Sequence, residues 1–300
     1  MNITKEEISG WFRQLQLHIC TELEAADCKA KFVEDAWERP GGGGGQTRVI
    51  QHGNVFEKGG VNFSAVHGEL SENIVKALGV NSKEFFATGI SIVIHPINPF
   101  VPIIHMNVRY FELSDGTYWF GGGIDLTPHY IQSDDSKFFH LQLKNTCDKS
   151  DDQYYTKFKK WADDYFYIKH RKETRGVGGI FFDRLKEDGV KSKKDIWNFV
   201  QSVGETFAPT YRNLVSSNKN KSYTDSNLQW RNLRRGRYVE FNLVYDKGTK
   251  FGLETDGRIE SILMSLPENA SWFYNHKPQE NGDEAFTLAH LSKGLDWINT

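Results

Sequence analysis

The sequence contains little cysteine, and this excludes several kinds of cofactor site. Its three cysteines, Cys20, Cys28 and Cys147, form no C-x-x-C pair. They cannot provide a disulfide framework or a thiolate zinc motif. An iron–sulfur cluster held by three or four clustered cysteines is excluded as well.

Long apolar runs and a strong net charge are also absent. No apolar run approaches the ~20 residues that a membrane-spanning helix needs, and residues 1–12 lack the basic start and apolar run of a signal peptide. Lys plus Arg number 37 and Asp plus Glu number 39, so no overall basic field would attract nucleic acid or a membrane. These features predict a cytoplasmic protein that neither spans a membrane nor binds nucleic acid.

The order of the expected elements favours an α+β fold. A chain of 300 residues can form one large domain or two small ones. Because no internal repeat or clear linker interrupts it, we expect a single domain over residues 1–300. Several hairpins, with helices before and between them, are typical of an antiparallel sheet packed on helices.

Hydrophobic periodicity and turn residues place the individual elements. Helices are expected at residues 4–28, 70–79, 151–172, 192–215 and 283–291. Strands are expected at residues 32–38, 48–56, 61–63, 88–95, 103–113, 117–121 and 237–245. A hairpin is expected to join residues 251–254 to 259–265, and residues 218–227 are expected to form a loop.

Two consecutive predicted strands carry an unusual set of polar groups on one face. Alternate side chains of a strand share a face. The shared face would carry Ser91, Val93, His95, His105, Asn107 and Arg109. A hydroxyl, two imidazoles, an amide and a guanidinium are suited to holding an anion and moving a proton.

Two glycine-rich stretches point to a ligand nearby. Gly121, Gly122 and Gly123 lie just before Asp125, and glycines in a strand indicate either a bulge or the close approach of a ligand. The adjacent carboxylate favours the ligand. Residues 41–45 are all glycine, but a strand-like run rather than a helix follows them, so they are a poor match to a phosphate-binding loop. A mobile loop over a site and a plain connector both stay open.

Five longer stretches together resemble one known enzyme family. They are residues 39–45, IHPINPFVPIIHMNVRYFE (94–112), WFGGGIDLTPHY (119–130), YFYIKHRKETRGVGGIFFD (165–183) and RGRYVEFNLVYDKGTKFGLETDGRIESILMSLP (235–267). Their order and composition are similar to oxygen-dependent coproporphyrinogen III oxidase over most of the chain. The resemblance implies a large, flat antiparallel sheet with helices on both faces. It also implies a homodimer and the oxidative decarboxylation of two propionates of coproporphyrinogen III in haem biosynthesis.

The resemblance also implies roles for particular residues. His105 matches the proton donor, and Asp125 and Arg109 match catalytic positions. Residues 235–270 match a dimerisation region. The positions that match substrate contacts are Ser91, Asn107, Val108, Arg109, Asp256, Gly257 and Arg258, although glycine would be expected where Asp256 stands. The positions that match ligands of a divalent metal, for which manganese is expected, are His95, His105, His140 and His170.

The residues themselves support this chemistry but leave alternatives open. Arg109 could clamp a carboxylate or form a structural ion pair. Asp125 could hold pyrrole N–H groups or cap a turn. Oxygen could react directly with the electron-rich pyrrole, without an organic cofactor, while His105 moves a proton. Two rivals are a non-haem iron oxygenase using His95, His105 and Asp125, and a tetrapyrrole carrier without catalysis.

Overall fold

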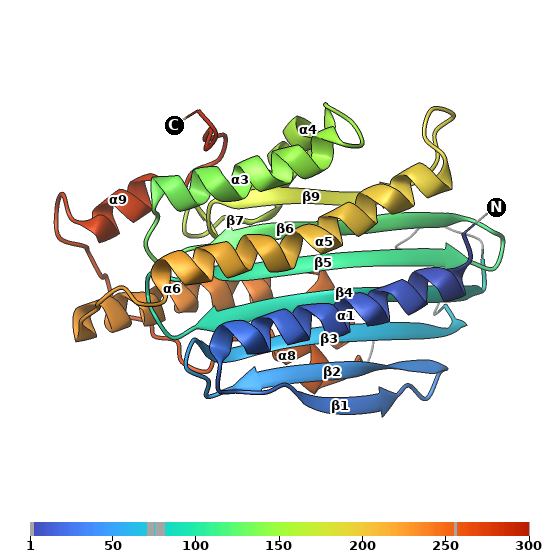
Figure 1. Ribbon diagram of the computed structural model, residues 1–300, viewed down its shortest axis with the longest axis horizontal. Coiled ribbons are helices and arrows are strands. Elements are labelled where there is room, and N and C mark those ends of the chain that lie inside the picture. The colour runs from blue at the N-terminus through green and yellow to red at the C-terminus, as the bar shows by residue number, and fades with distance from the viewer. Residues whose placement is uncertain (1–2, 71–74, 76–81, 255–256, 300) are drawn as a thin grey trace.

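The middle layer of the protein is a seven-stranded antiparallel sheet (Figure 1). The computed structural model describes residues 3–70, 75, 82–254 and 257–299. The strands, in spatial order, are β1 (Val33–Glu38), β2 (Gly43–Gln51), β3 (Phe56–Glu69), β4 (Glu84–Pro96), β5 (Ile103–Leu113), β6 (Tyr118–Thr127) and β9 (Gly178–Leu185). The first six follow chain order and pair with their neighbours, so most connections are hairpins. The α+β fold predicted from the sequence is confirmed.

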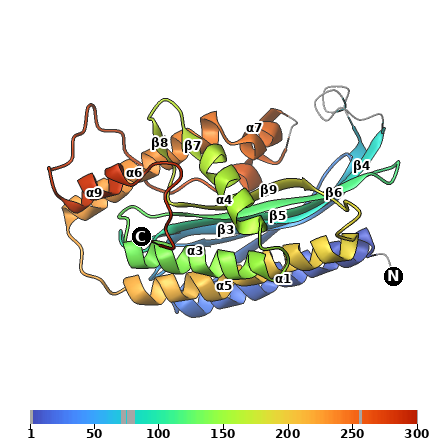
Figure 2. The same ribbon diagram turned by 90° about the horizontal axis from the view of Figure 1, so that it is seen from above.

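Three long helices cover one face of the sheet: α1 (Lys5–Asp27), α3 (Ser133–Asp148) and α5 (Lys193–Asn218). They lie side by side along this face (Figure 2). α1 begins at a capping box made by Thr4 and Glu7, as the sequence predicts. The main apolar core lies between these helices and side chains such as Ile92 and Met106.

Helices cover only part of the opposite face. α6 (Asp225–Val244), α7 (Lys247–Glu254) and α8 (Ile259–Leu263) lie on this side. Tyr238 of α6 packs on Val93 and Ile103. Ser261 of α8 accepts a hydrogen bond from Asn62 through its carbonyl oxygen. The sheet therefore has helices on both faces.

The remaining elements lie beside β9 and near α6. α4 (Tyr154–Tyr165) packs along β9, and the two-residue strands β7 (Tyr167–Ile168) and β8 (Glu173–Thr174) pair just after it. α9 (Asp283–Ala289) confirms the short helix predicted near the carboxyl end. None of the helices in the described ranges combines the length and the apolarity that crossing a membrane requires.

The prediction for residues 225–265 is wrong. The strand expected at residues 237–245 is part of α6, and the expected hairpin is replaced by α7 and α8. The cause is the composition of the buried face of α6. Four of its arginines are buried there, and a pattern that counts arginine as exposed cannot detect this helical face. The buried arginines are Arg231, Arg234, Arg235 and Arg237.

Several other expectations need correction. Gly43, Gly44 and Gly45 belong to β2 and pair with β3, so they do not form a loop over the site. Gly41 and Gly42 lie in the turn that connects β1 to β2. The helix predicted to reach residue 172 ends at Tyr165, and α3 was not predicted. α5 continues through Pro209 to Asn218. The helix predicted at residues 70–79 lies almost entirely outside the described residues.

Candidate functional site

The polar residues predicted to share a face do share it. In the strand register, His105 of β5 lies opposite Asp125 of β6, and Arg109 lies opposite Gly121. Ser91 of β4 lies opposite Asn107. Directly opposed residues of an antiparallel pair point to the same side of the sheet. His105, Arg109 and Asp125 therefore all lie on the face that α6 and α8 only partly cover, which we call the site face.

Asp125 is the buried centre of this group. It is 1% exposed. Its Oδ1 accepts a hydrogen bond from Nδ1 of His105 at 2.7 Å, and both its oxygens accept from Nη2 of Arg175, at 2.9 and 2.7 Å. Burial acts to raise the pKa of Asp125, but the charge of Arg175 and the hydrogen bond from His105 outweigh it and lower the pKa. The carboxylate is therefore held in its charged form.

Arg175 is the residue of this group that the sequence reasoning missed. It is 3% exposed, and its Nη1 donates to Oδ1 of Asn242 of α6 at 2.9 Å. Its guanidinium carbon lies 4.4 to 4.7 Å from the ring centroids of Phe166, Tyr238 and Phe241. The only signal in the sequence is its place just before the glycines at residues 176, 178 and 179.

The pairing with Asp125 determines which nitrogen of His105 can act. Since a carboxylate only accepts, Nδ1 of His105 carries the proton in this hydrogen bond. Nε2 has no hydrogen-bond partner within the part of the chain that the structure describes, and the side chain is 21% exposed. Nε2 is therefore the nitrogen that can exchange a proton with a molecule on the site face.

Arg109 is held in an ion pair at the rim of this group. Its Nη2 lies 2.9 Å from Oδ1 of Asp183, and its Nη1 donates to Oδ1 of Asn107 at 2.7 Å. The pair is half-exposed, so water or a ligand can reach it. A methyl group at Gly121 would lie 2.6 Å from Asp183 and 2.7 Å from Arg109. The glycine opposite Arg109 therefore makes room for the ion pair.

The other predicted substrate contacts have different positions. Ser91 lies beside Asn107 on the site face, but the side chain of Val108 is buried in the core on the opposite side. Arg258 donates to Asp35 of β1 and to Ser261. Gly257 follows α7, and Asp256 lies outside the described residues.

Comparisons with known proteins identify the family. A sequence profile described as coproporphyrinogen III oxidase matches residues 7–297. The chain belongs to the coproporphyrinogen III oxidase family. It is 50% identical to the oxygen-dependent coproporphyrinogen-III oxidase of Drosophila melanogaster, over 95% of this chain and 76% of that protein. It is 47% identical to coproporphyrinogen-III oxidase 1, chloroplastic, of Arabidopsis thaliana, over 95% and 77%. It is 44% identical to the enzyme of Prochlorococcus marinus, over 95% and 88%.

The four histidines expected as metal ligands have separate partners in this family member. His95 is buried and its Nε2 donates to the carbonyl oxygen of Ser265 at 2.8 Å. His140 lies in α3 and bonds Tyr155 and the carbonyl oxygen of Val177. His170 bonds Tyr245 and Glu240.

These histidines do not fit a shared metal site within the chain. Within residues 3–70, 75, 82–254 and 257–299, no group of three or more His, Cys, Asp or Glu residues could hold a metal ion. His95, His105 and Asp125 therefore do not form the facial triad of a non-haem iron oxygenase. Burial holds the pKa of His95 well below its ordinary value and lowers that of His140 to about 3, so both rings are neutral near pH 7.

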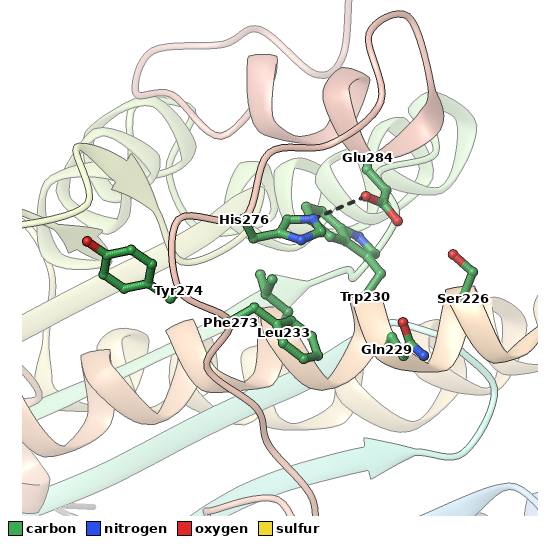
Figure 3. Close-up of a pocket in the computed structure, with 8 residues that line it drawn as sticks. All are labelled: Ser226, Gln229, Trp230, Leu233, Phe273, Tyr274, His276 and Glu284. Carbon is green, nitrogen blue, oxygen red and sulfur yellow. Dashed lines mark ion pairs between the residues drawn. The ribbon is translucent and has the colours of Figure 1, made fainter.

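A separate pocket of about 300 Å³ lies between α6 and residues 273–284 (Figure 3). His276 and Glu284 face each other in it, with 3.5 Å between Nε2 and Oε2. It is lined by Ser226, Gln229, Trp230, Leu233, Phe273, Tyr274, His276 and Glu284. None of these residues is among those predicted for catalysis or substrate binding, so the site face of the sheet is the candidate active site.

Proposed function

We propose that this protein oxidatively decarboxylates two propionate side chains of coproporphyrinogen III to vinyl groups, with molecular oxygen as oxidant and protoporphyrinogen IX as product. Membership of the family supports the substrate. The observation that best supports this reaction is that the His105–Asp125 pair and Arg109 lie on the same face of the sheet. This face offers a cation for a carboxylate and, four residues away along β5, a group that can exchange a proton.

The reaction balances with oxygen alone as the electron acceptor. One propionate, one O2 and one proton become one vinyl group, one CO2 and one H2O2. The bond from the β-carbon to hydrogen breaks, the bond to the carboxylate carbon breaks, and two electrons pass to oxygen. No organic cofactor enters this balance, because the electron-rich pyrrole can react with oxygen directly.

We assign separate roles to the residues of the site face. His105 supplies and accepts the proton through Nε2. Asp125 keeps the proton of His105 on Nδ1, since both its oxygens are already used by His105 and Arg175. Arg109 binds the carboxylate of the reacting propionate through the N–H donors that Asn107 and Asp183 do not use. Ser91 and Asn107 lie next to it and contact the substrate beside the reacting group.

We also propose that the protein is a homodimer formed through residues 235–270. Large apolar side chains are exposed on α6, α7 and α8, which contact one another in sequence. They are Leu243, Val244, Phe251, Leu253 and Ile259, each 41–59% exposed. Clustered exposed apolar groups are typical of a protein interface.

A single domain is supported by one apolar core that includes both Ile8 and Trp297.

A cytoplasmic location stays a prediction. The names of several relatives include the words chloroplastic or mitochondrial. Fractionating cells that produce the tagged chain would test it.

The cheapest test of the function is to incubate the purified protein with coproporphyrinogen III in air and under nitrogen. We expect conversion to the divinyl product in air, with two O2 consumed per substrate, and none under nitrogen. Binding without conversion would indicate a tetrapyrrole carrier. Loss of conversion after treatment with a chelator, restored by iron, would indicate the iron oxygenase.

A further inference from the structure

A row of stacked aromatic rings continues the site face beyond Arg109. Phe111 is two residues from Arg109 along β5, so both side chains point to the same side. The ring of Phe111 stacks on Phe85 of β4, with 5.6 Å between centroids and 7° between planes. It also stacks on Trp119 of β6, at 4.5 Å and 20°. All three rings are half-exposed. They form an apolar strip next to the ion pair of Arg109.

Arg39 lies at the β4 end of this strip. Its guanidinium carbon lies 5.7 Å from the centroid of the Phe85 ring. Its Nη1 donates to the carbonyl oxygen of His67 at 3.1 Å. A methyl group at Gly41 would lie 2.5 Å from this Nη1, and one at Gly68 would lie 3.3 Å from it. The two glycines therefore leave room for the guanidinium, and the carbonyl and the ring hold it in place.

Among the described residues, Arg39 lacks the carboxylate partner that several other partly exposed arginines have. Within the described part of the chain, no carboxylate lies within 4 Å of its side chain, whereas Arg48, Arg109 and Arg258 each pair with one. A guanidinium has five N–H donors, and one of those of Arg39 is used by His67. Within the described residues the others have no protein acceptor, so they can bind an anion.

The spacing fits a ligand with carboxylates on more than one side. Phe85 lies opposite Leu113 in the register, and Leu113 is four residues from Arg109. This corresponds to about 13 Å along the strand. Arg39 lies beside the Phe85 ring at one end of this stretch and Arg109 at the other. A cation at each end of the stacked rings matches a flat tetrapyrrole with propionates around its rim.

We propose that Arg39 is a second carboxylate-binding position, which holds a propionate remote from the one that reacts at Arg109 and His105. This proposal rests on the proposed function, because it takes the porphyrinogen as the ligand. The stacked rings of Phe85, Phe111 and Trp119 support the apolar part of the macrocycle between the two positions. Arg39 then contributes to selection of substrates by the number and placement of their carboxylates.

The test compares two ligands and three proteins under nitrogen, where binding is measured without turnover. The ligands are coproporphyrinogen III and its analogue in which the two propionates that survive the reaction are replaced by ethyl groups. The proteins are the wild type, Arg39→Ala and the control Arg13→Ala. Arg13 of α1 also stacks on a phenylalanine, Phe63, at 5.2 Å, but Phe63 belongs to the core on the opposite side of the sheet.

We expect Arg39→Ala to raise the Kd for coproporphyrinogen III by about tenfold to a hundredfold, the usual effect of losing a charge-assisted hydrogen bond. The Kd for the ethyl analogue should be the same in all three proteins. An equal rise in Kd for both ligands in Arg39→Ala would overturn the proposal, since Arg39 would then act by stabilising the fold. An unchanged Kd for both would overturn it too. Wild-type protein that binds but shows no turnover in air would contradict the proposed function and leave the role of Arg39 standing.

Discussion

Arg175 places one nitrogen, Nη2, within 2.9 Å of both carboxylate oxygens of Asp125. Both side chains are almost fully buried, and Asp125 in turn holds His105. The charge of the guanidinium opposes transfer of the His105 proton to Asp125. The proton therefore stays on Nδ1 of His105, and the proposed mechanism assigns proton exchange to the imidazole rather than to Asp125.

The first prediction concerns this buried pair. Arg175→Met should lower the free energy of unfolding by about 3–5 kcal/mol, because it leaves Asp125 charged and unpaired in the interior. The double variant with Asp125→Leu should recover much of this loss, since neither charge remains. Urea titrations of the wild type, both single variants and the double variant measure the coupling. Strictly additive losses would show that the two residues do not stabilise each other.

A second prediction uses the glycine opposite Arg109. Gly121→Ala should leave the protein folded but raise KM by about tenfold or more, because the methyl group displaces Arg109 and Asp183 from their positions. Gly10→Ala is the control, since a methyl group at Gly10 meets no atom within 4 Å. That change should leave KM unaltered and stabilise α1 by about 1 kcal/mol. Equal KM values in all three proteins would argue against a role for Arg109 in binding.

A third prediction follows from His140. Burial lowers its pKa to about 3 in the folded protein, while the unfolded chain takes up a proton near pH 6.5. Its contribution to stability is therefore complete above pH 6.5 and is lost as the pH falls toward 3. Between pH 6.5 and pH 5 the loss should be about 2 kcal/mol. Over this range the free energy of unfolding of His140→Gln should fall by about 2 kcal/mol less than that of the wild type. Parallel curves from urea unfolding of the two proteins would contradict the prediction.

A fourth prediction concerns the dimer. Val244→Asp should convert the wild-type dimer to a monomer, because it puts a charge on the exposed apolar surface of α6. Val190→Asp is the matched control, since Val190 is 87% exposed and lies outside residues 235–270. Sedimentation velocity at micromolar concentration separates the outcomes. A monomeric wild type, or a dimer that persists in Val244→Asp, would place the interface elsewhere or remove it.

The sheet could be predicted well because buried apolar and partly exposed polar side chains alternate along its strands. On β5 the residues at positions 104, 106, 108 and 110 are buried apolar side chains, while His105, Asn107 and Arg109 between them are not. That pattern determines which groups share a face once the strand pairs with its neighbours. The spacing along β5 and the hairpin to β6 were therefore enough to predict that His105, Arg109 and Asp125 lie on one face.

α6 could not be predicted in the same way. Its buried side includes four arginines, and the charges of three are balanced by residues far away in the sequence: Glu57 for Arg231 and Arg235, and Glu173 for Arg234. A local pattern contains no information about these partners. Arg175 was missed for the same reason, because its partner Asp125 is 50 residues away.

The histidines expected as metal ligands show a further limit of prediction from sequence. The positions of His95, His140 and His170 match those of the family's metal ligands. One nitrogen of each ring bonds to a group elsewhere in the chain: a backbone carbonyl, a tyrosine and a glutamate. Nδ1 of His95 has no hydrogen-bond partner among the described residues. Matching positions in a sequence does not determine which atoms the side chains reach. The packing of distant segments decides it, such as α4 with Tyr155 against α3. Whether these histidines bind a metal stays a prediction.

The most direct measurement is oxygen uptake with coproporphyrinogen III by the wild type, His105→Ala and Asp125→Ala, with circular dichroism as the control for folding. Asp125→Asn is included because it keeps the shape of the buried side chain. We expect uptake to fall about a hundredfold or more in each variant while the fold survives. Wild-type rates of uptake in folded His105→Ala and Asp125→Ala would contradict a reaction that depends on this pair.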